Sequence, residues 1–167
     1  MHHNLQPREY QKNIATSVSS ENSIVALPTG LGKTVIALMV AENRLKLHPK
    51  GKILLLAPTK PLVFQHASFF TNNGIHCDVL TGEELPDSRS KMWDLSQIIS
   101  ATPQTVINDV RSNRVHLKDF ILSVIFFLPP PISIRIKPNF RVLIFVTYPS
   151  LFDKISPLKF ELPNKLL

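Results

Sequence analysis

The stretch SIVALPTGLGKTVIALMVAENRLKLH, residues 23–48, decides the fold of this 167-residue chain. It begins with a short run of branched apolar residues, passes through a loop with two glycines, and continues as a segment of helical period that stops before Pro49. A strand, a tight loop and a helix in this order form a turn whose backbone N–H groups and helix N-terminus face an anion. The stretch therefore predicts a phosphate-binding loop at the end of a strand.

The loop sequence ALPTGLGKT contains the residue types that phosphate binding needs. Gly30 and Gly32 allow the tight backbone, Lys33 would contact the β- and γ-phosphates, and the Thr34 hydroxyl would be a ligand of Mg²⁺. The general pattern is not complete, because Leu27 stands where its first glycine should be. The alternative is a plain glycine turn that happens to contain Lys and Thr. The order of strand, loop and helix favours the phosphate site.

The same alternation of apolar strands and helices continues along the chain. We expect further strands at 52–58, 76–82, 97–101 and 121–127, and helices at 61–74, 87–95 and 102–113. Nearly continuous apolar strands joined by helices are typical of a parallel sheet with helices on both faces. The fold class predicted is therefore α/β, in one doubly wound domain.

Composition sets looser limits on function. The chain is 44% hydrophobic and 19% charged, as expected of a globular protein, and its formal net charge of +7 suits a polyanionic partner such as nucleic acid. No secretory signal is visible, Cys77 has no partner for an internal disulfide, and the apolar run 120–128 is too short to span a membrane. We expect a cytoplasmic protein without a membrane segment.

Five segments occur in the order of the motifs of superfamily 2 helicases and resemble them. They are LQPREYQ (5–11), PTGLGKT (28–34), APTKPLVFQHA (57–67), TGEE (81–84) and ATPQTV (101–106). Each is weak alone, and the first would otherwise be taken for a polar surface terminus. The segments LAPTKPLVFQHA and IISATPQTVINDV are most similar to those of the archaeal Hef-type helicases and the related Fanconi anaemia M helicase, which act on branched DNA.

The resemblance implies a RecA-like P-loop NTPase lobe with ATP and Mg²⁺ as cofactors and single-stranded or branched DNA as partner. Gln11 would contact the adenine edge while Arg8 braces the loop. The ATP-binding residues it implies are Arg8, Gln11, Pro28, Thr29, Gly30, Leu31, Gly32, Lys33 and Thr34, with Thr34 also the metal ligand. The nucleic-acid-binding residues it implies are Pro58, Thr59, Lys60, Thr81, Gly82, Thr102, Pro103 and Gln104.

The resemblance stops where the family carries its catalytic acids. There, a run like DFILSVIF, here residues 119–126, leads into Asp-Glu-Ala-His, but in this chain it leads into Phe127 and Leu128. The family's Asp anchors the metal and its Glu positions the attacking water. Asp119 precedes the strand, at the wrong end, and the next acid is Asp153. We therefore predict no catalytic residue, and no hydrolysis by this lobe without a second motor lobe.

Composition changes abruptly after residue 126. Residues 127–167 contain no glycine or alanine, seven of the fourteen prolines, and a net charge of +4 from six basic and two acidic residues. Segments 132–137 and 140–148 have strand-like patterns, but no helix fits between the prolines. We expect a partial ATP-binding domain at 1–126 and an irregular Pro-rich basic tail outside the family fold. A shifted reading frame is one hypothesis for this tail, and a genuine divergent ending is the other.

Two functional classes remain open. The first is an ATP-dependent DNA helicase, represented by its N-terminal lobe. The second is a non-catalytic nucleotide- and DNA-binding module. A P-loop kinase for a small metabolite is disfavoured, because it would not need APTKPL and ATPQT at strand ends.

Overall fold

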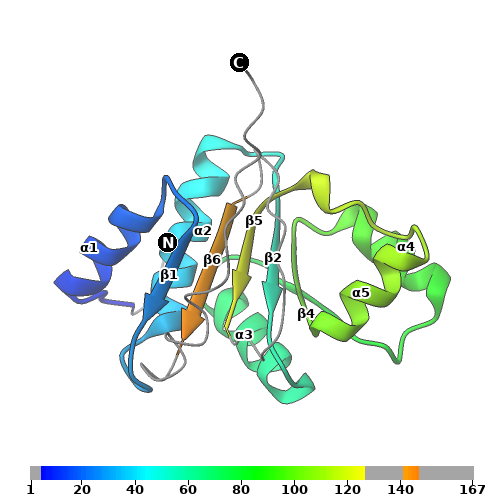
Figure 1. The fold of residues 1–167 in the computed structure, drawn as a ribbon, viewed down its shortest axis with the longest axis horizontal. Helices are drawn as coiled ribbons and strands as arrows, with labels where there is room; N and C mark the ends of the chain where they lie inside the picture. Colours follow the sequence, from blue (N-terminus) through cyan, green and yellow to red (C-terminus); the bar gives the residue numbers. More distant parts are fainter. Residues whose placement is uncertain (1–4, 127–140, 147–167) are drawn as a thin grey trace, which may run out of the picture.

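The computed structural model describes residues 5–126 and 141–146. In this part of the chain, parallel strands form a single sheet in the order β1-β6-β5-β2-β4-β3 (Figure 1). The strands are β1 (Ser23–Ala26), β2 (Lys52–Leu56), β3 (Asp78–Leu80), β4 (Ile98–Ala101), β5 (Phe120–Ile125) and β6 (Arg141–Val146). The predicted parallel α/β sheet is confirmed.

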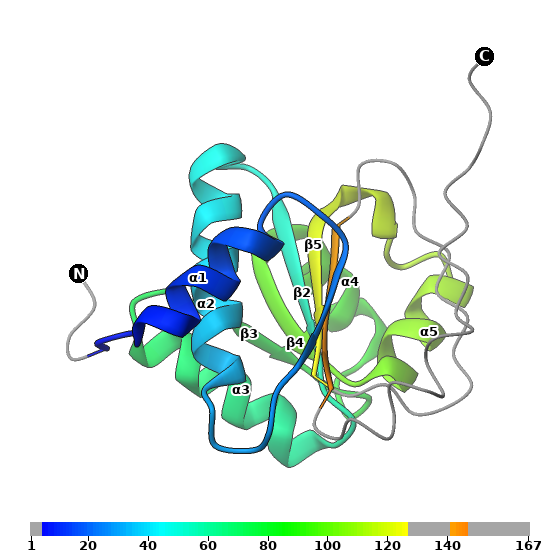
Figure 2. The ribbon, with the colours of Figure 1, turned by 60° about the vertical axis from the view of Figure 1, so that its left-hand side comes forward.

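Helices cover both faces of this sheet. They are α1 (Glu9–Val18), α2 (Lys33–Leu47), α3 (Lys60–Asn72), α4 (Pro86–Leu95), α5 (Pro103–Arg111) and the short 3₁₀ helix η1 (Leu117–Asp119). Figure 2 shows α1, α2 and α3 on one face and α4 and α5 on the other, with α1 lying against α2. Among these helices, none combines the length and the apolar character needed to cross a membrane.

Each face of the sheet has its own hydrophobic core. Successive side chains of a strand point to opposite faces, and β2 divides in this way. Ile53 and Leu55 pack in the cluster beneath α2 and α3, while Leu54 packs with Trp93 and Phe120 on the other face. Burial on both faces explains why the strands are nearly continuous apolar runs, as the sequence predicted.

Strand β6 lies beyond the predicted domain boundary at 126. It lies inside the sheet, pairing in parallel with β1 on one side and β5 on the other. Residues 141–146 are therefore part of the sheet, and they fall within the second strand-like segment, 140–148. The other strand-like segment, 132–137, lies outside the described residues.

The parallel arrangement places the carboxyl ends of the strands along one edge, where the arrowheads lie in Figure 1. The segments after β1, β2, β3 and β4 therefore emerge at the same edge. Open α/β sheets bind their ligands at this edge. All the motif segments except the first, 5–11, lie there.

Candidate nucleotide and nucleic-acid site

The loop between β1 and α2 has the backbone shape that its glycines predicted. Gly30 has a φ of 86° and Gly32 a φ of 72°, in the left-handed region that favours glycine. Gly32 is the N-cap of α2, and its carbonyl accepts from the N–H groups of Val35 at 3.0 Å and Ile36 at 3.2 Å. Because the first N–H groups of a helix have no partner within it, the loop opens directly onto unsatisfied donors and the positive end of the α2 dipole.

Lys33 holds its charge inside this loop. Its Nζ donates to the carbonyl oxygens of Leu27 and Pro28, each at 3.0 Å. Burial lowers the pKa of Lys33 from its ordinary value. The ammonium is thus already partly desolvated beside the loop, where it can exchange a carbonyl acceptor for a phosphate oxygen.

Helix α1 braces the loop from outside. Gln11 Nε2 donates to the Leu31 carbonyl at 3.2 Å, and the Tyr10 hydroxyl donates to the same oxygen at 2.9 Å. A Cβ on Gly32 would lie 2.3 Å from Gln11 Nε2, so this close approach also requires glycine. The resemblance implied that Arg8 braces the loop; its backbone N–H donates to Gln11 Oε1 at 2.9 Å. Gln11 and Tyr10 make the brace, and Tyr10 was missed.

An open cavity of about 510 Å³ lies between the loop and α3. It is lined by Thr29, Gly30, Gly32, Lys33, Thr34, Val35, Pro58, Leu62, Gln65, His66, Phe69 and Phe126. Five of the predicted ATP-binding residues therefore line one cavity: Thr29, Gly30, Gly32, Lys33 and Thr34. Pro58, which was predicted to face nucleic acid, also lines this cavity. The segment before α3 therefore borders both the cavity and the predicted nucleic-acid contacts.

Two stacked rings, those of His66 and Phe126, line the cavity. The Phe126 ring stacks on His66 with centroids 3.6 Å apart, and it also stacks on Phe145 of β6 at 5.6 Å. Thr34 Oγ1 lies 3.5 Å from His66 Nδ1. Burial lowers the pKa of His66 to about 4, so its ring is neutral at pH 7. His66 was not predicted as a site residue. The available signal was its position in the motif-like segment APTKPLVFQHA, residues 57–67.

The end of β5, where the family carries its acids, is apolar up to the last described residue. Phe126 is 8% exposed, and its N–H donates to the Leu56 carbonyl at 3.0 Å. Asp119 lies in η1, at the amino end of β5, as predicted. Phe127 and Leu128 lie outside the described residues. None of the residues that line the described cavity is acidic.

The predicted nucleic-acid contacts come from three neighbouring strands. Residues 58–60, 81–84 and 102–104 follow β2, β3 and β4, which are adjacent in the sheet, and we call them the nucleic-acid edge. The N–H of Ala57 donates to the Ala101 carbonyl at 3.2 Å, which ties two of these strand ends together. Pro58, Thr59, Lys60, Gly82 and Gln104 are exposed there.

Two of the threonines predicted to contact nucleic acid have partners within the protein. Thr81 is 2% exposed, and the Glu84 carboxylate accepts from its N–H at 2.8 Å and from its hydroxyl at 3.0 Å. Thr102 is the N-cap of α5, and its Oγ1 accepts from the N–H of Thr105 at 3.4 Å. In this structure both hydroxyls hold the backbone of the edge.

A buried carboxylate beneath the edge was not predicted. Asp109 of α5 is fully buried and accepts from Trp93 Nε1 at 2.9 Å, Arg89 Nη2 at 3.0 Å and Arg114 Nη1 at 3.2 Å. Burial raises the pKa of its carboxyl, but hydrogen bonds from Trp93 and Arg89 outweigh it and lower the pKa. Arg89 Nη1 also donates to the Glu84 carbonyl at 2.7 Å. Asp109 therefore anchors the TGEE turn through Arg89.

A glycine loop between β1 and α2, on a parallel sheet with helices on both faces, is the arrangement of a RecA-like helicase lobe. Residues 8–126 match the family model described as DEAD/DEAH box helicase, and the chain belongs to this family. The match ends at the residue where the sequence departs from the family's pattern.

Similar proteins agree with this assignment. The chain is 42% identical over 122 residues to the ATP-dependent DNA helicase mph1 of Aspergillus oryzae, and 39% identical over 132 residues to MPH1 of Scheffersomyces stipitis. These alignments cover 71% and 73% of this chain but only 11% and 12% of the relatives. The crystal structure of the Pyrococcus furiosus Hef helicase domain superposes with a TM-score of 0.81 at 37% identity, covering 94% of this chain and 37% of that one. The predicted resemblance to Hef-type helicases is confirmed.

Proposed function

We propose that this chain is the N-terminal ATP-binding lobe of an ATP-dependent DNA helicase of the branched-DNA repair type, working inside the cell. Family membership supports the class. The observation that carries the nucleotide part is the meeting of Lys33 and Thr34 at the N-terminus of α2, beside a cavity of about 510 Å³. Cavities of this size accommodate small-molecule ligands and cofactors.

The residues at the cavity fit ATP with Mg²⁺. Lys33 supplies a positive charge, Gly30 and Gly32 let the backbone approach the phosphates, and the Thr34 hydroxyl is an oxygen ligand of the kind that Mg²⁺ prefers. Bound Mg²⁺ would offset phosphate charge during binding. Contact of Gln11 with an adenine edge requires its amide to exchange a present partner, since both amide ends are hydrogen-bonded within the protein.

A second candidate is a non-catalytic nucleotide- and DNA-binding module. The observation that favours it is the absence of any Asp or Glu between residues 120 and 152. Loss of a positioned general base typically costs about a hundredfold to ten-thousandfold in rate. We propose that the chain binds ATP but does not hydrolyse it at a rate useful to a motor.

Calorimetry and turnover assays test both candidates. Lys33→Ala removes the charge at the phosphates and is expected to weaken ATP binding about tenfold or more, roughly 1.4 kcal/mol. Equal affinity of both proteins for ATP would overturn the nucleotide assignment. ATP turnover that forked DNA stimulates, and that Lys33→Ala abolishes, would instead establish the chain as a catalyst.

We further propose that the nucleic-acid edge binds single-stranded DNA through backbone phosphates. Such binding is weak, indifferent to sequence and steeply salt-dependent. The basic residues after 146 are the rival source of affinity. Deleting 127–167 would remove β6 from the middle of the sheet, so the sharper variant is Lys154→Gln with Lys159→Gln and Lys165→Gln. If this folded variant loses all binding while Lys60→Ala loses none, the edge is not the DNA site.

A further inference from the structure

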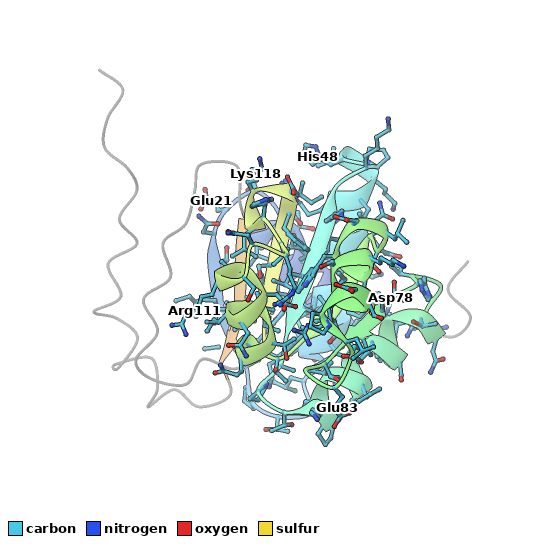
Figure 3. All side chains as sticks on the ribbon, turned by 90° about the vertical axis from the view of Figure 1, so that its right-hand side faces the viewer. Glu21, His48, Asp78, Glu83, Arg111 and Lys118 are labelled. Atoms are coloured by element: carbon cyan, nitrogen blue, oxygen red, sulfur yellow. The ribbon has the colours of Figure 1, made fainter. Side chains whose placement is uncertain are left out.

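One ion pair joins two segments of the nucleic-acid edge. Lys60 Nζ, at the start of α3, bonds to the Glu83 carboxylate in the turn after β3. Their side chains are 48% and 76% exposed, so the pair lies in water at the rim. Figure 3 shows Glu83 at one end of the molecule, far from Glu21, His48 and Lys118 at the other. This is the end where the strands finish.

Glu83 is held in place by the turn that carries it. Its N–H donates to Thr81 Oγ1 at 3.3 Å, and Glu84 fixes Thr81 through the N–H and the hydroxyl. The Glu84 carbonyl accepts from Arg89, which is itself anchored on buried Asp109. The carboxylate therefore belongs to a braced backbone, and its partner Lys60 lies at the first residue of a helix.

The carboxylate occupies the place that a strand phosphate needs. Lys60 is the basic side chain of the segment 58–60, beside the N-terminus of α3, where an anion is favoured by the helix dipole. A carboxylate and a phosphate oxygen both accept from an ammonium group, so they compete for the same donor. In a chain of net charge +7, an acid at this point opposes the overall attraction for nucleic acid.

We propose that Glu83 is an affinity-setting residue: it occupies Lys60 in the free protein and must be displaced by a backbone phosphate when a strand binds. This inference rests on the nucleic-acid binding proposed above. An exposed ion pair is worth little, so breaking it costs about twofold to fivefold in strand affinity. Glu83 also takes up a cation when it is released, which offsets part of the counterion release from the strand.

The test measures binding of fluorescent single-stranded oligodeoxynucleotide to the full chain across a salt series. Glu83→Gln keeps the shape and removes the competing charge, while Glu21→Gln makes the same charge change at the opposite end of the molecule. Glu83→Gln is expected to tighten binding about twofold to fivefold relative to Glu21→Gln, with a salt slope steeper by up to about 0.7, one phosphate contact's share. Circular dichroism confirms that each variant is folded.

A Lys60→Ala background separates competition from simple repulsion. If Glu83 acts by occupying Lys60, adding Glu83→Gln to Lys60→Ala changes affinity no more than Glu21→Gln does. A gain that persists in this background overturns the inference, as does a Glu83→Gln variant that matches Glu21→Gln. If Lys60→Ala binds as tightly as the wild type, or the wild type does not bind at all, the proposed nucleic-acid function fails as well, which distinguishes the two failures.

Discussion

The two ends of the strand edge, each of which we propose binds an anion, are built in opposite ways. At the phosphate loop, Lys33 donates to two backbone carbonyls, and no acidic side chain lines the described cavity. At the nucleic-acid edge, carboxylates hold the structure: Glu83 on Lys60, Glu84 on Thr81 and, beneath them, Asp109 on Arg89.

The difference lies in how each end holds its shape without a ligand. A glycine loop shapes itself through backbone torsions, so it can leave its charge on weak, exchangeable carbonyl partners. The edge is assembled from three separate strand ends, and side-chain charges add links to the backbone pairing of the strands. Removing the buried carboxylate of Asp109 should therefore damage the edge, whereas replacing a glycine should damage the loop.

The largest effect is expected from Asp109→Ala. The change leaves Trp93 Nε1 without its acceptor and the Arg89 and Arg114 charges without their partner in a buried site. Breaking a buried pair in this way costs about 3–5 kcal/mol, measured as the free energy of unfolding in urea. Asp94→Ala, an exposed acid on α4, is the control and should change stability by less than about 0.5 kcal/mol. A loss of similar size in both variants would show that the edge does not depend on the buried carboxylate.

The second effect is acid destabilisation at the nucleotide end. Burial lowers the pKa of His66 to about 4 in the folded chain, against about 6.5 unfolded. The folded state favours the neutral ring. The contribution of His66 to the free energy of unfolding is therefore fully present above pH 6.5 and is lost as the pH falls toward 4. The loss approaches roughly 3 kcal/mol. Urea unfolding at pH 7.5 and pH 4.5 measures it, and His66→Phe, which keeps an aromatic ring but cannot titrate, should remove most of the difference. An unchanged difference in His66→Phe would assign it to other groups.

Periodicity of apolar residues was enough to predict most of the fold. Eight of the predicted elements are present within one or two residues. Strands β2, β4 and β5 are apolar runs buried on both faces, and α2 and α3 end just before Pro49 and Gly74. Helix α1 was missed because its buried residues are Gln11 and Ala15, which form no apolar stripe. The place of β6 between β1 and β5 depends on pairing far along the chain, which local pattern does not encode.

The sequence predicted the backbone of the candidate site, but not the side chains that hold this backbone in place. The left-handed backbone at Gly30 and Gly32 follows from their spacing alone. A threonine at a strand end is equally suited to cap a helix and to bind a phosphate, so Thr81 and Thr102 could not be assigned from sequence. Asp109, Tyr10 and His66 act on segments distant in the chain, and only the fold brings them there.

A matched glycine pair tests the loop. Both Gly30 and Gly32 have positive φ, so alanine at either position costs about 1 kcal/mol. Only at Gly32 does the new Cβ meet Gln11 Nε2, which displaces the amide from Leu31 and Tyr10 and adds about 1 kcal/mol. Gly32→Ala should therefore be less stable than Gly30→Ala in thermal unfolding. Equal stabilities would mean that Gln11 does not brace the loop.

The smallest effect concerns the dual suitability of threonine at the nucleic-acid edge. Thr102 Oγ1 accepts from the Thr105 N–H and forms a hydrogen bond of 2.9 Å with the Thr105 hydroxyl. Because removal of an N-cap hydroxyl typically costs about 1 kcal/mol, Thr102→Ala should lower the free energy of unfolding by that amount, while Thr102→Ser keeps the cap and the stability. Strand affinity, measured where both variants are fully folded, should match the wild type in each. A Thr102→Ala variant of unchanged stability but weakened strand binding would reverse the assignment, making Thr102 a ligand contact and bringing this part of the edge closer in character to the phosphate loop.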